Sequence, residues 1–330
     1  MSTAHLAEPH LVGFQDDFNA LRHELAKVVV GHADVIEQVL IAAVAGGHVI
    51  IEGVPGLGKT LLVQTLADIL QLRFSRIQFT SDLTPSDLLG TFVVMETAAG
   101  RRTFEFQQGP IFSNLVLADH INRGLPKTQS ALLQAMEGEE IHVSTETFQL
   151  PQPFFVVGTQ NPLEMEGTFP LPEPEIDRFF FKLVVKGPSV DELDAILQRT
   201  TESAPAELRA VVDGKRLLEM RQIAGNVSLP ATGRRWVASL VAATHPDFPQ
   251  ATELVKHYVR YGASPRAAQA LVMAAKVRAA ANARTEVAKE DFAATIVPAL
   301  RHRILLNFEG QAENVRTEAL IDSIVKSMKA

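Results

Sequence analysis

The residues best suited to do chemistry form one glycine-rich segment, Gly53-Val54-Pro55-Gly56-Leu57-Gly58-Lys59-Thr60. It matches the pattern G-x-x-x-x-G-K-[ST], whose glycines let backbone N–H groups wrap phosphates at the start of a helix. Lys59 is placed to neutralise the β- and γ-phosphates, and Thr60 to set its hydroxyl on Mg²⁺. We therefore expect the chain to bind a nucleoside triphosphate. The predicted nucleotide-binding residues here are Gly53, Pro55, Gly56, Leu57, Gly58, Lys59, Thr60 and Leu61.

A carboxylate suited to hold the same metal ion is Asp119, which directly follows the apolar run Leu115–Ala118. A phosphate loop needs such an acid on a neighbouring strand, and the carboxyl end of a buried strand is the expected place. Thr60 and Asp119 are therefore the predicted Mg²⁺ ligands. The ten histidines show no H-E-x-x-H or other tight spacing, and the chain has no cysteine, so no second metal is predicted.

These side chains need a scaffold that brings strand ends together, and the first half of the sequence predicts one. Short apolar runs alternate with helical patterns, which is typical of a parallel α/β sheet with helices on both faces. The strand-like runs are His48–Ile51, Phe74–Phe79, Leu115–Ala118, Phe154–Gly158 and Phe181–Val185. The helical patterns are Phe18–Val30, Val35–Ala45, Lys59–Leu70 and Thr128–Met136. We expect a doubly wound α/β core with the nucleotide at the carboxyl ends of the strands.

Two pieces inside this pattern have the alternation of β-hairpins, one at residues 91–107 and one at residues 141–150. Beyond Gly187-Pro188 the strand signals vanish and Ala-rich helical stretches follow. These stretches are Val190–Thr200, Lys215–Ile223, Arg235–Ala243, Pro265–Ala283 and Asp291–Leu300. We therefore predict two domains, an α/β core at residues 1–187 and a small helical domain at residues 188–330, with the nucleotide between them.

Composition narrows the class of protein. Of the 330 residues, 46% are hydrophobic and 21% are charged, so the chain can bury a full core. The formal net charge is −7 and the first half is the more acidic one, which argues against nucleic-acid binding. Without cysteine, disulfides and thiol nucleophiles are excluded. We see neither a signal peptide nor a stretch long and apolar enough to span a bilayer, and we expect a cytoplasmic protein.

Taken together, these motifs resemble the MoxR family of AAA+ ATPases, in the helix-2-insert clade related to magnesium-chelatase-type ATPases. The likeness covers nearly the whole chain. Besides the phosphate loop and Asp119, the matching segments are Gly31-His32, Thr84–Gly90, Gly109–Phe112, Ile121–Arg123, Pro126–Leu133, Gly158–Pro162, Glu166–Thr168, Pro170–Glu173, Asp177–Phe179 and Gly262–Ala267. The resemblance implies an AAA+ core followed by a helical lid domain.

The resemblance also implies roles for residues outside the phosphate loop. Gly31 and His32 would make the adenine-side contacts. Asn161 would be the first sensor, aiming its amide at the γ-phosphate or the attacking water, although a turn asparagine before proline gives the same pattern. Arg178 would reach the nucleotide of a neighbouring subunit, the alternative being a surface arginine paired with Asp177. Arg266 would be the second sensor, touching the phosphates from the lid.

A trans-acting arginine implies a ring of identical subunits, and the expected assembly is a nucleotide-promoted hexamer. The resemblance implies a chaperone-like ATPase that remodels or matures a partner protein, and proteins with a von Willebrand factor type A domain are common partners in the family. The hairpin at 91–107 would be the helix-2 insert and that at 141–150 the pre-sensor insert. Met95, Phe104 and Phe106 are the residues predicted to contact a partner.

One residue departs from the family pattern. The position after Asp119 normally holds a glutamate that polarises the attacking water, and here it is His120. Loss of a positioned general base lowers rates by about 10²–10⁴. We expect intact ATP binding with slow hydrolysis, or the use of another acid such as Glu164 or Glu166. The competing hypotheses are that His120 itself accepts the proton, or that it was introduced to trap a bound state.

Three other functions remain to be weighed. A scaffold that binds ATP without turning it over is the alternative that His120 favours. A nucleic-acid motor is disfavoured by the acidic core and by the lack of a winged-helix or helix-turn-helix segment. A small-molecule kinase or a GTPase would need an acceptor pocket or an N-K-x-D guanine motif, and the sequence has no N-K-x-D.

Overall fold

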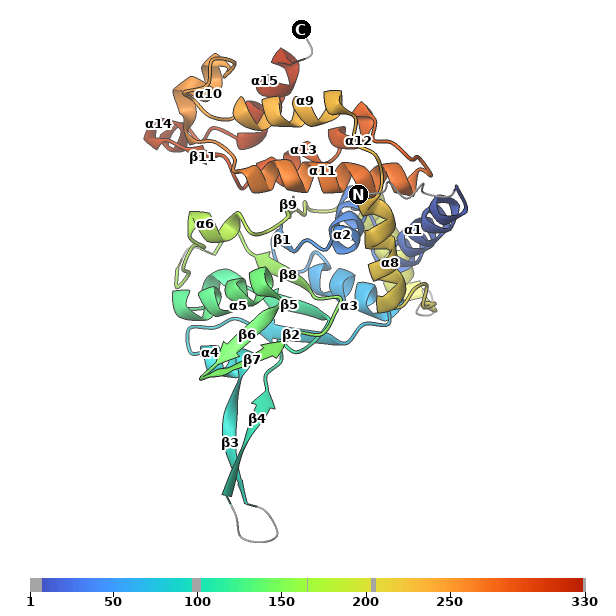
Figure 1. Ribbon diagram of the computed structural model, residues 1–330, viewed down its shortest axis with the longest axis vertical. Coiled ribbons are helices and arrows are strands. Elements are labelled where there is room, and N and C mark those ends of the chain that lie inside the picture. The colour runs from blue at the N-terminus through green and yellow to red at the C-terminus, as the bar shows by residue number, and fades with distance from the viewer. Residues whose placement is uncertain (1–7, 97–101, 165, 203–205, 329–330) are drawn as a thin grey trace.

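The computed structural model describes residues 8–96, 102–164, 166–202 and 206–328. Its centre is a sheet of five parallel strands in the order β2-β5-β8-β1-β9 (Figure 1). The strands are β1 (Val49–Glu52), β2 (Phe74–Gln78), β5 (Leu115–Asp119), β8 (Phe155–Gln160) and β9 (Phe181–Val184). Each predicted strand is present, with its ends shifted by a residue or two.

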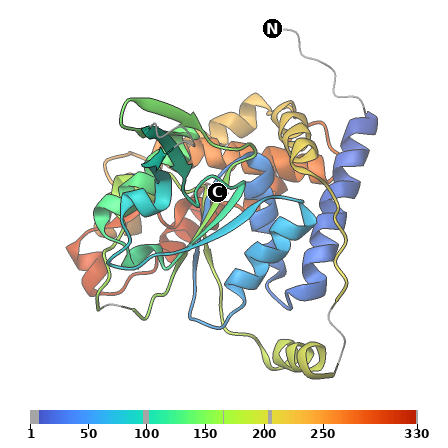
Figure 2. The same cartoon turned by 90° about the horizontal axis from the view of Figure 1, so that it is seen from below.

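Helices cover both faces of this sheet (Figures 1 and 2). The first face packs on α1 (Glu8–Val28), α2 (Ala33–Ala45) and α3 (Lys59–Ile69), and the second on α4 (Pro85–Leu89) and α5 (Pro126–Gly138). Successive residues of a strand point to opposite faces, so Val49 and Ile51 pack with the first group while Ile50 packs with the second. The near-continuous apolar strands reflect burial on both sides, and the predicted doubly wound α/β core is confirmed.

Helix α1 begins at Glu8, ten residues before the predicted start at Phe18. Leu11 and Phe14 extend the spacing of buried residues that continues through Phe18, Leu21 and Leu25. This spacing of three and four residues is that of one helix face, and the prediction cut it short.

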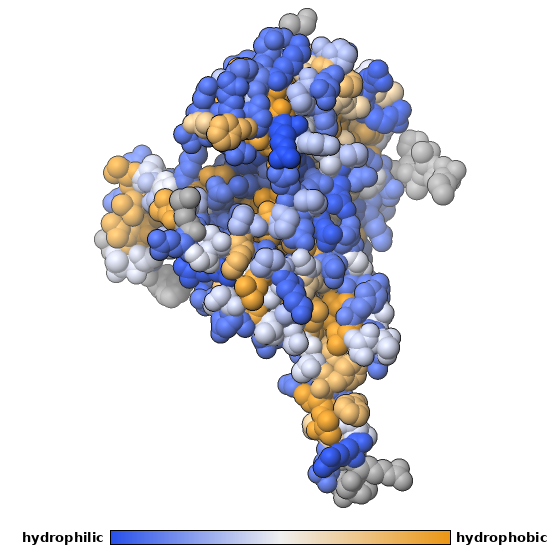
Figure 3. Space-filling model, turned by 90° about the vertical axis from the view of Figure 1, so that its left-hand side faces the viewer, coloured by the Kyte–Doolittle hydropathy of each residue, from blue (hydrophilic) through white to orange (hydrophobic). Residues whose placement is uncertain are grey.

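Both predicted hairpins are present. β3 (Gly90–Glu96) pairs with β4 (Arg102–Gln108), and β6 (Glu140–Val143) pairs with β7 (Glu146–Gln149), both antiparallel. The β3–β4 ribbon projects away from the sheet, and Figure 3 shows apolar residues gathered along it. The turn predicted at 98–100 lies outside the described residues.

The base of the ribbon is fixed by aromatic stacking. The ring of Phe106 stacks on Phe148 of β7, with centroids 4.1 Å apart, and also contacts Phe92 and Phe112. Phe106 is therefore engaged within the protein, unlike Phe104 and Met95, which are 74% and 48% exposed. Of the three predicted contact residues, only these two are available on the surface.

The C-terminal region is mainly helical, as predicted. Its elements are α7 (Val190–Leu197), a π-helical turn (Gln198–Glu202), α8 (Gly214–Gly225), α9 (Ala231–Ala242), α10 (Glu253–Tyr258), β10 (Val259–Tyr261), α11 (Pro265–Ala281), α12 (Lys289–Ala293), α13 (Ile296–Leu300), β11 (Leu305–Leu306), α14 (Phe308–Ala312) and α15 (Thr317–Ser327). The small β10–β11 ribbon is too short to give a periodic signal in the sequence, and was not predicted. In the described part of the chain, no helix has the length and apolar character needed to cross a membrane.

The division at residue 187 stays a prediction. Helix α8 contacts α1 and α2 of the core as well as α11 of the helical region. The predicted helix Asp291–Leu300 is also two helices, α12 and α13, separated at Ala294-Thr295.

One buried arginine fastens the helical region to the sheet. Arg303, whose side chain is 2% exposed, donates to the Asp177 carboxylate at 2.8 Å. It also donates to the carbonyl oxygens of Asp177, Phe179, Phe180 and Ala299, at 2.5–3.2 Å. This nearly buried charge is therefore paired and hydrogen-bonded just before β9.

We predict that Arg303→Ala lowers the free energy of unfolding by about 3–5 kcal/mol, because it removes the nearest positive charge from Asp177 and leaves several carbonyl oxygens without their donor. Urea denaturation measures the change. Arg316→Ala is the matched control, since that arginine is 77% exposed and its ion pair with Glu318 is long, at 3.7 Å. Its loss should change the free energy of unfolding by at most about 1 kcal/mol. Equal effects of the two substitutions would contradict the anchoring role.

Candidate functional site

The predicted phosphate loop connects the carboxyl end of β1 to the first turn of α3. Gly56 and Gly58 have φ angles of 85° and 73°, the left-handed region that glycine favours, and no atom lies within 4 Å of a Cβ built on either. At Gly53 a Cβ would lie 3.0 Å from the Val185 carbonyl oxygen. The loop therefore has an open side, bare of side chains, next to the helix N-terminus where anions bind.

Lys59 lies within this loop and close to acidic groups. Its Nζ donates to the carbonyl oxygens of Gly53 and Val54, each at 2.7 Å. Burial lowers the pKa of Lys59, and the negative charges of Asp119 and Glu164 offset this only in part. Of the other predicted loop residues, Leu57 and Thr60 are half-buried, and Pro55 and Leu61 are exposed.

Asp119 ends β5 and is 5% exposed. Its Oδ1 accepts a hydrogen bond from the Thr159 hydroxyl at 2.6 Å, and its Oδ2 accepts from Arg76 Nη2 and Nε at 2.6 and 3.1 Å. Burial raises the pKa of Asp119, but the hydrogen bonds from Thr159 and Arg76 outweigh burial and bring the pKa below its ordinary value. A buried, ionised carboxylate therefore lies beside the phosphate loop.

Asn161 follows β8, the strand between β1 and β5, so the three strand ends meet at one edge of the sheet. Its Nδ2 donates to Glu164 Oε1 at 2.9 Å. The other oxygen of Glu164 accepts from Arg123 Nε at 2.8 Å and lies 3.3 Å from His120 Nδ1. Burial raises the pKa of Glu164, but these hydrogen bonds together have the larger effect and bring the pKa below its ordinary value. Glu166, the other predicted substitute acid, is exposed.

His120 lies between the two carboxylates. Its backbone is left-handed, with φ 55°, and its N–H donates to the Thr159 hydroxyl at 2.9 Å. Its Nε2 lies 3.9 Å from Asp119 Oδ1, and Glu164 is on the opposite side of the ring. The imidazole is therefore oriented by Glu164 and directed toward the predicted metal ligand.

Gly31 and His32 also lie at this edge. Both have a left-handed backbone, with φ 71° and 52°. They directly precede α2, and because α2 ends just before β1, its start lies toward the carboxyl end of that strand. A Cβ on Gly31 would lie 2.4 Å from Glu192 Oε1, so α7 covers this turn.

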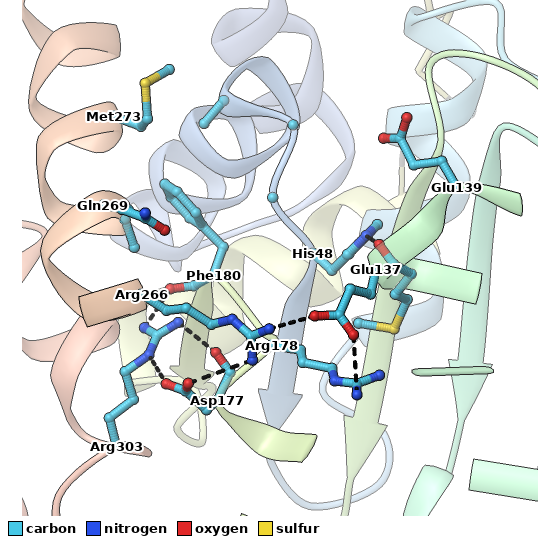
Figure 4. Close-up of a pocket in the computed structure, with 15 residues that line it drawn as sticks. His48, Glu137, Glu139, Asp177, Arg178, Phe180, Arg266, Gln269, Met273 and Arg303 are labelled. Carbon is cyan, nitrogen blue, oxygen red and sulfur yellow. Dashed lines mark hydrogen bonds and ion pairs between the residues drawn. The ribbon is translucent and has the colours of Figure 1, made fainter. Parts of the chain in front are cut away.

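Arg178 and Arg266 lie elsewhere, in a pocket of about 390 Å³ at the amino end of β1 (Figure 4). The sequence predicted that Arg178 lies on a short helix, but it follows that helix, α6 (Glu173–Ile176). The N–H of the nearby Phe180 donates to the His48 carbonyl oxygen just before β1. Arg266 is the second residue of α11. The structure thus brings Arg266 to Arg178 and away from the phosphate loop of its own chain. That Arg266 touches phosphates as the second sensor stays a prediction.

Three residues of the site were not predicted. Arg76 and Thr159 hold Asp119, and Arg123 holds Glu164. Thr159 stands two residues before Asn161 on the same strand end, which is a usable signal. Arg76 has none, because only the parallel register of β2 with β5 shows that it reaches Asp119.

A magnesium–nucleotide complex fits this edge. In such sites Mg²⁺ is held by one or two protein oxygens together with phosphates and water. The candidate oxygens are the Thr60 hydroxyl and the ionised Asp119, whose oxygens keep a second lone pair beside the hydrogen bonds from Thr159 and Arg76. Within the described residues no group of three or more His, Asp or Glu side chains could hold a metal alone. The open side of Gly56 and Gly58 leaves the loop accessible to phosphates.

Comparison with known proteins agrees with this geometry. Residues 48–181 match the ATPase family associated with various cellular activities (AAA), and residues 251–324 match an AAA lid domain. The chain is 37% identical to Chaperone MoxR1 of Mycobacterium tuberculosis over 305 residues, which are 92% of this chain and 80% of that relative. The chain belongs to the MoxR family of AAA+ ATPases.

Other relatives extend the likeness over the whole length of this MoxR-family chain. It is 38% identical to YeaC of Bacillus subtilis, over 96% of this chain and 97% of that protein. It is 28% identical to the protein MoxR of Paracoccus denitrificans, over 90% of each. A solved structure from Cytophaga hutchinsonii, described as an ATPase, superposes with a TM-score of 0.89 at 38% identity, covering 97% and 96% of the two chains.

We predict that Lys59→Met weakens binding of Mg-ATP by about 10²-fold or more, because it removes the cation that faces the phosphates. A titration with a fluorescent ATP analogue measures the affinity. Lys276→Met is the matched control, since Lys276 is also half-buried, with a pKa lowered by burial, but donates to the Gly225 carbonyl oxygen in the lid. The site assignment is wrong if both variants bind nucleotide as the parent chain does.

Proposed function

We propose that this chain binds Mg-ATP at the phosphate loop and acts, in a ring of identical subunits, as a chaperone-like remodeller or maturation factor of partner proteins. The observation that carries the proposal is the meeting of three strand ends at one edge. Lys59 lies in the loop after β1, Asp119 is the last residue of β5, and Asn161 directly follows β8. The negative charge of Asp119 raises the pKa of Lys59, which burial lowers. In the proposed site, Mg²⁺ would link Thr60 and Asp119 to the phosphates and supply charge for the transfer.

The ring follows from the position of the two arginines. Arg178 and Arg266 are at the amino end of β1, whereas the phosphate loop is at its carboxyl end. A phosphoryl group can be stabilised by an arginine from a neighbouring subunit, which raises rates by about 10³–10⁵. Both arginines are therefore assigned to the nucleotide of the next subunit, and the proposed assembly is a hexamer.

The β3–β4 ribbon is the proposed contact with the partner. Phe104, Val94 and Met95 are 74%, 54% and 48% exposed, and Val94 is the cross-strand neighbour of Phe104. Exposed apolar side chains on a projecting ribbon suit contact with another protein. The relative named Chaperone MoxR1 supports a role on proteins, and a von Willebrand factor type A domain protein is the partner class proposed from the family resemblance.

We infer that hydrolysis is slow. His120 stands where the family has a glutamate. The acid nearest to its imidazole, Glu164, already accepts hydrogen bonds from Asn161 and Arg123. An ionised carboxylate with both oxygens in use is a poor proton acceptor for a water molecule. A nucleotide-gated scaffold without turnover is the alternative proposal, and it rests on the same residue, His120.

We predict that His120→Glu raises the rate of single-turnover ATP hydrolysis by roughly 10²-fold, because it restores a carboxylate base beside the metal ligand. Rapid-quench measurement with excess enzyme gives the rate. His10→Glu, an exposed change on α1, controls for added negative charge. A rise of less than about threefold would show that His120 or another group already serves as the base.

A mixing experiment tests the action of Arg178 in trans. Lys59→Met and Arg178→Gln subunits are each expected to be inactive, but in a ring the phosphate loop of an Arg178→Gln subunit meets the intact Arg178 of a Lys59→Met neighbour. A one-to-one mixture should restore ATP hydrolysis at roughly a quarter of its interfaces. ATP turnover and light scattering are measured on the same samples. Mixtures that form rings and yet stay inactive would contradict the assignment.

A further inference from the structure

Two arginines that belong to different parts of the chain converge on one carboxylate. Glu137 lies in the last turn of α5 and is half-exposed. Its Oε2 lies 3.1 Å from Arg178 Nη2, and its Oε1 accepts a hydrogen bond of 2.5 Å from Arg266 Nη2 (Figure 4). One guanidinium comes from the segment before β9 and the other from the lid, so Glu137 joins core and lid at this point.

These arginines differ from Arg303, which shares their pocket. Every nitrogen of the Arg303 guanidinium has a partner within the protein. Arg178 donates through Nη1 to the Leu133 carbonyl oxygen, while its buried Nε has no partner among the described residues. Arg303 is thus a structural arginine, whereas Arg178 and Arg266 retain donors that protein atoms do not use.

Asp177, which also lines the pocket, cannot replace Glu137. Asp177 accepts two hydrogen bonds from the Ser264 hydroxyl, at 2.9 and 2.8 Å, and one from Arg303. Its distance to Arg266 Nη1 is 3.8 Å. Without Glu137, Arg178 and Arg266 would therefore face each other with no carboxylate between them, and like charges would separate.

We propose that Glu137 is a positioning residue that holds Arg178 and Arg266 side by side for the triphosphate of the neighbouring subunit. The proposal rests on the proposed action of these arginines in trans. A carboxylate presents two oxygens to two guanidinium groups much as a phosphate does, so the pair is already arranged before the neighbour arrives. Arg178 Nε is buried, so the donors left to contact the phosphates are the second hydrogens of the Nη nitrogens of the two arginines.

The test is the rate at which a fluorescent ATP analogue leaves the assembled protein, a readout that does not need hydrolysis. Glu137→Gln should speed release by about tenfold, because it removes the charge and one of the two acceptors. Glu137→Asp, which keeps the carboxylate, should restore release to within about threefold of the parent. In an Arg178→Gln/Arg266→Gln chain, Glu137→Gln should change nothing further, since Glu137 acts only through these two residues.

Glu139→Gln is the matched control, because Glu139 lines the same pocket and contacts neither arginine in the structure. If Arg178→Gln and Arg266→Gln leave release unchanged, the proposed action in trans is wrong. If they speed release but Glu137→Gln does not, or slows it, the positioning role is wrong. Light scattering accompanies each measurement, and loss of the assembly in both Glu137 variants would also overturn the proposal, since Glu137 would then hold the interface.

Discussion

The parallel pairing of β1 with β8 and β9 is the constraint on which the rest of the structure depends. At its carboxyl end β1 delivers the phosphate loop, and the neighbouring strand ends bring Asn161 and Asp119 to the same edge. At its amino end, the segment before β9 brings Arg178 next to α11 of the lid. One short strand therefore separates the phosphate loop from Arg178 and Arg266, and in the proposed ring the loop of one subunit would meet the arginines of the next.

The acidic side of the site is held by more contacts than its sequence motif contains. Thr159 donates to Asp119 and accepts from the His120 backbone, so one hydroxyl fixes both the predicted metal ligand and the direction of the residue after it. Arg76 keeps the buried carboxylate ionised from the other side. The backbone at position 120 is thus tied to β8 through Thr159.

The sequence predicts well what depends on local pattern. Strands buried on both faces read as apolar runs, and the phosphate loop and Asp119 are found because both directly follow such runs. Where a residue's position depends on packing between distant segments, prediction stops. Arg266 was expected above the phosphates, but the start of its helix is held by the Ser264 hydroxyl, which donates to Asp177, 87 residues away. No local spacing encodes that contact.

The charges around His120 explain why nucleotide binding and hydrolysis can be separated at this site. Lys59, Arg76 and Arg123 face the two carboxylates Asp119 and Glu164, which leaves one positive charge in excess. A glutamate at position 120 would cancel that excess, whereas a histidine adds no negative charge and so leaves the excess for the phosphates. The same exchange removes a carboxylate that could accept a proton from water. In this MoxR-family chain, the proposed slow hydrolysis and intact nucleotide binding would therefore both follow from the one exchange at His120.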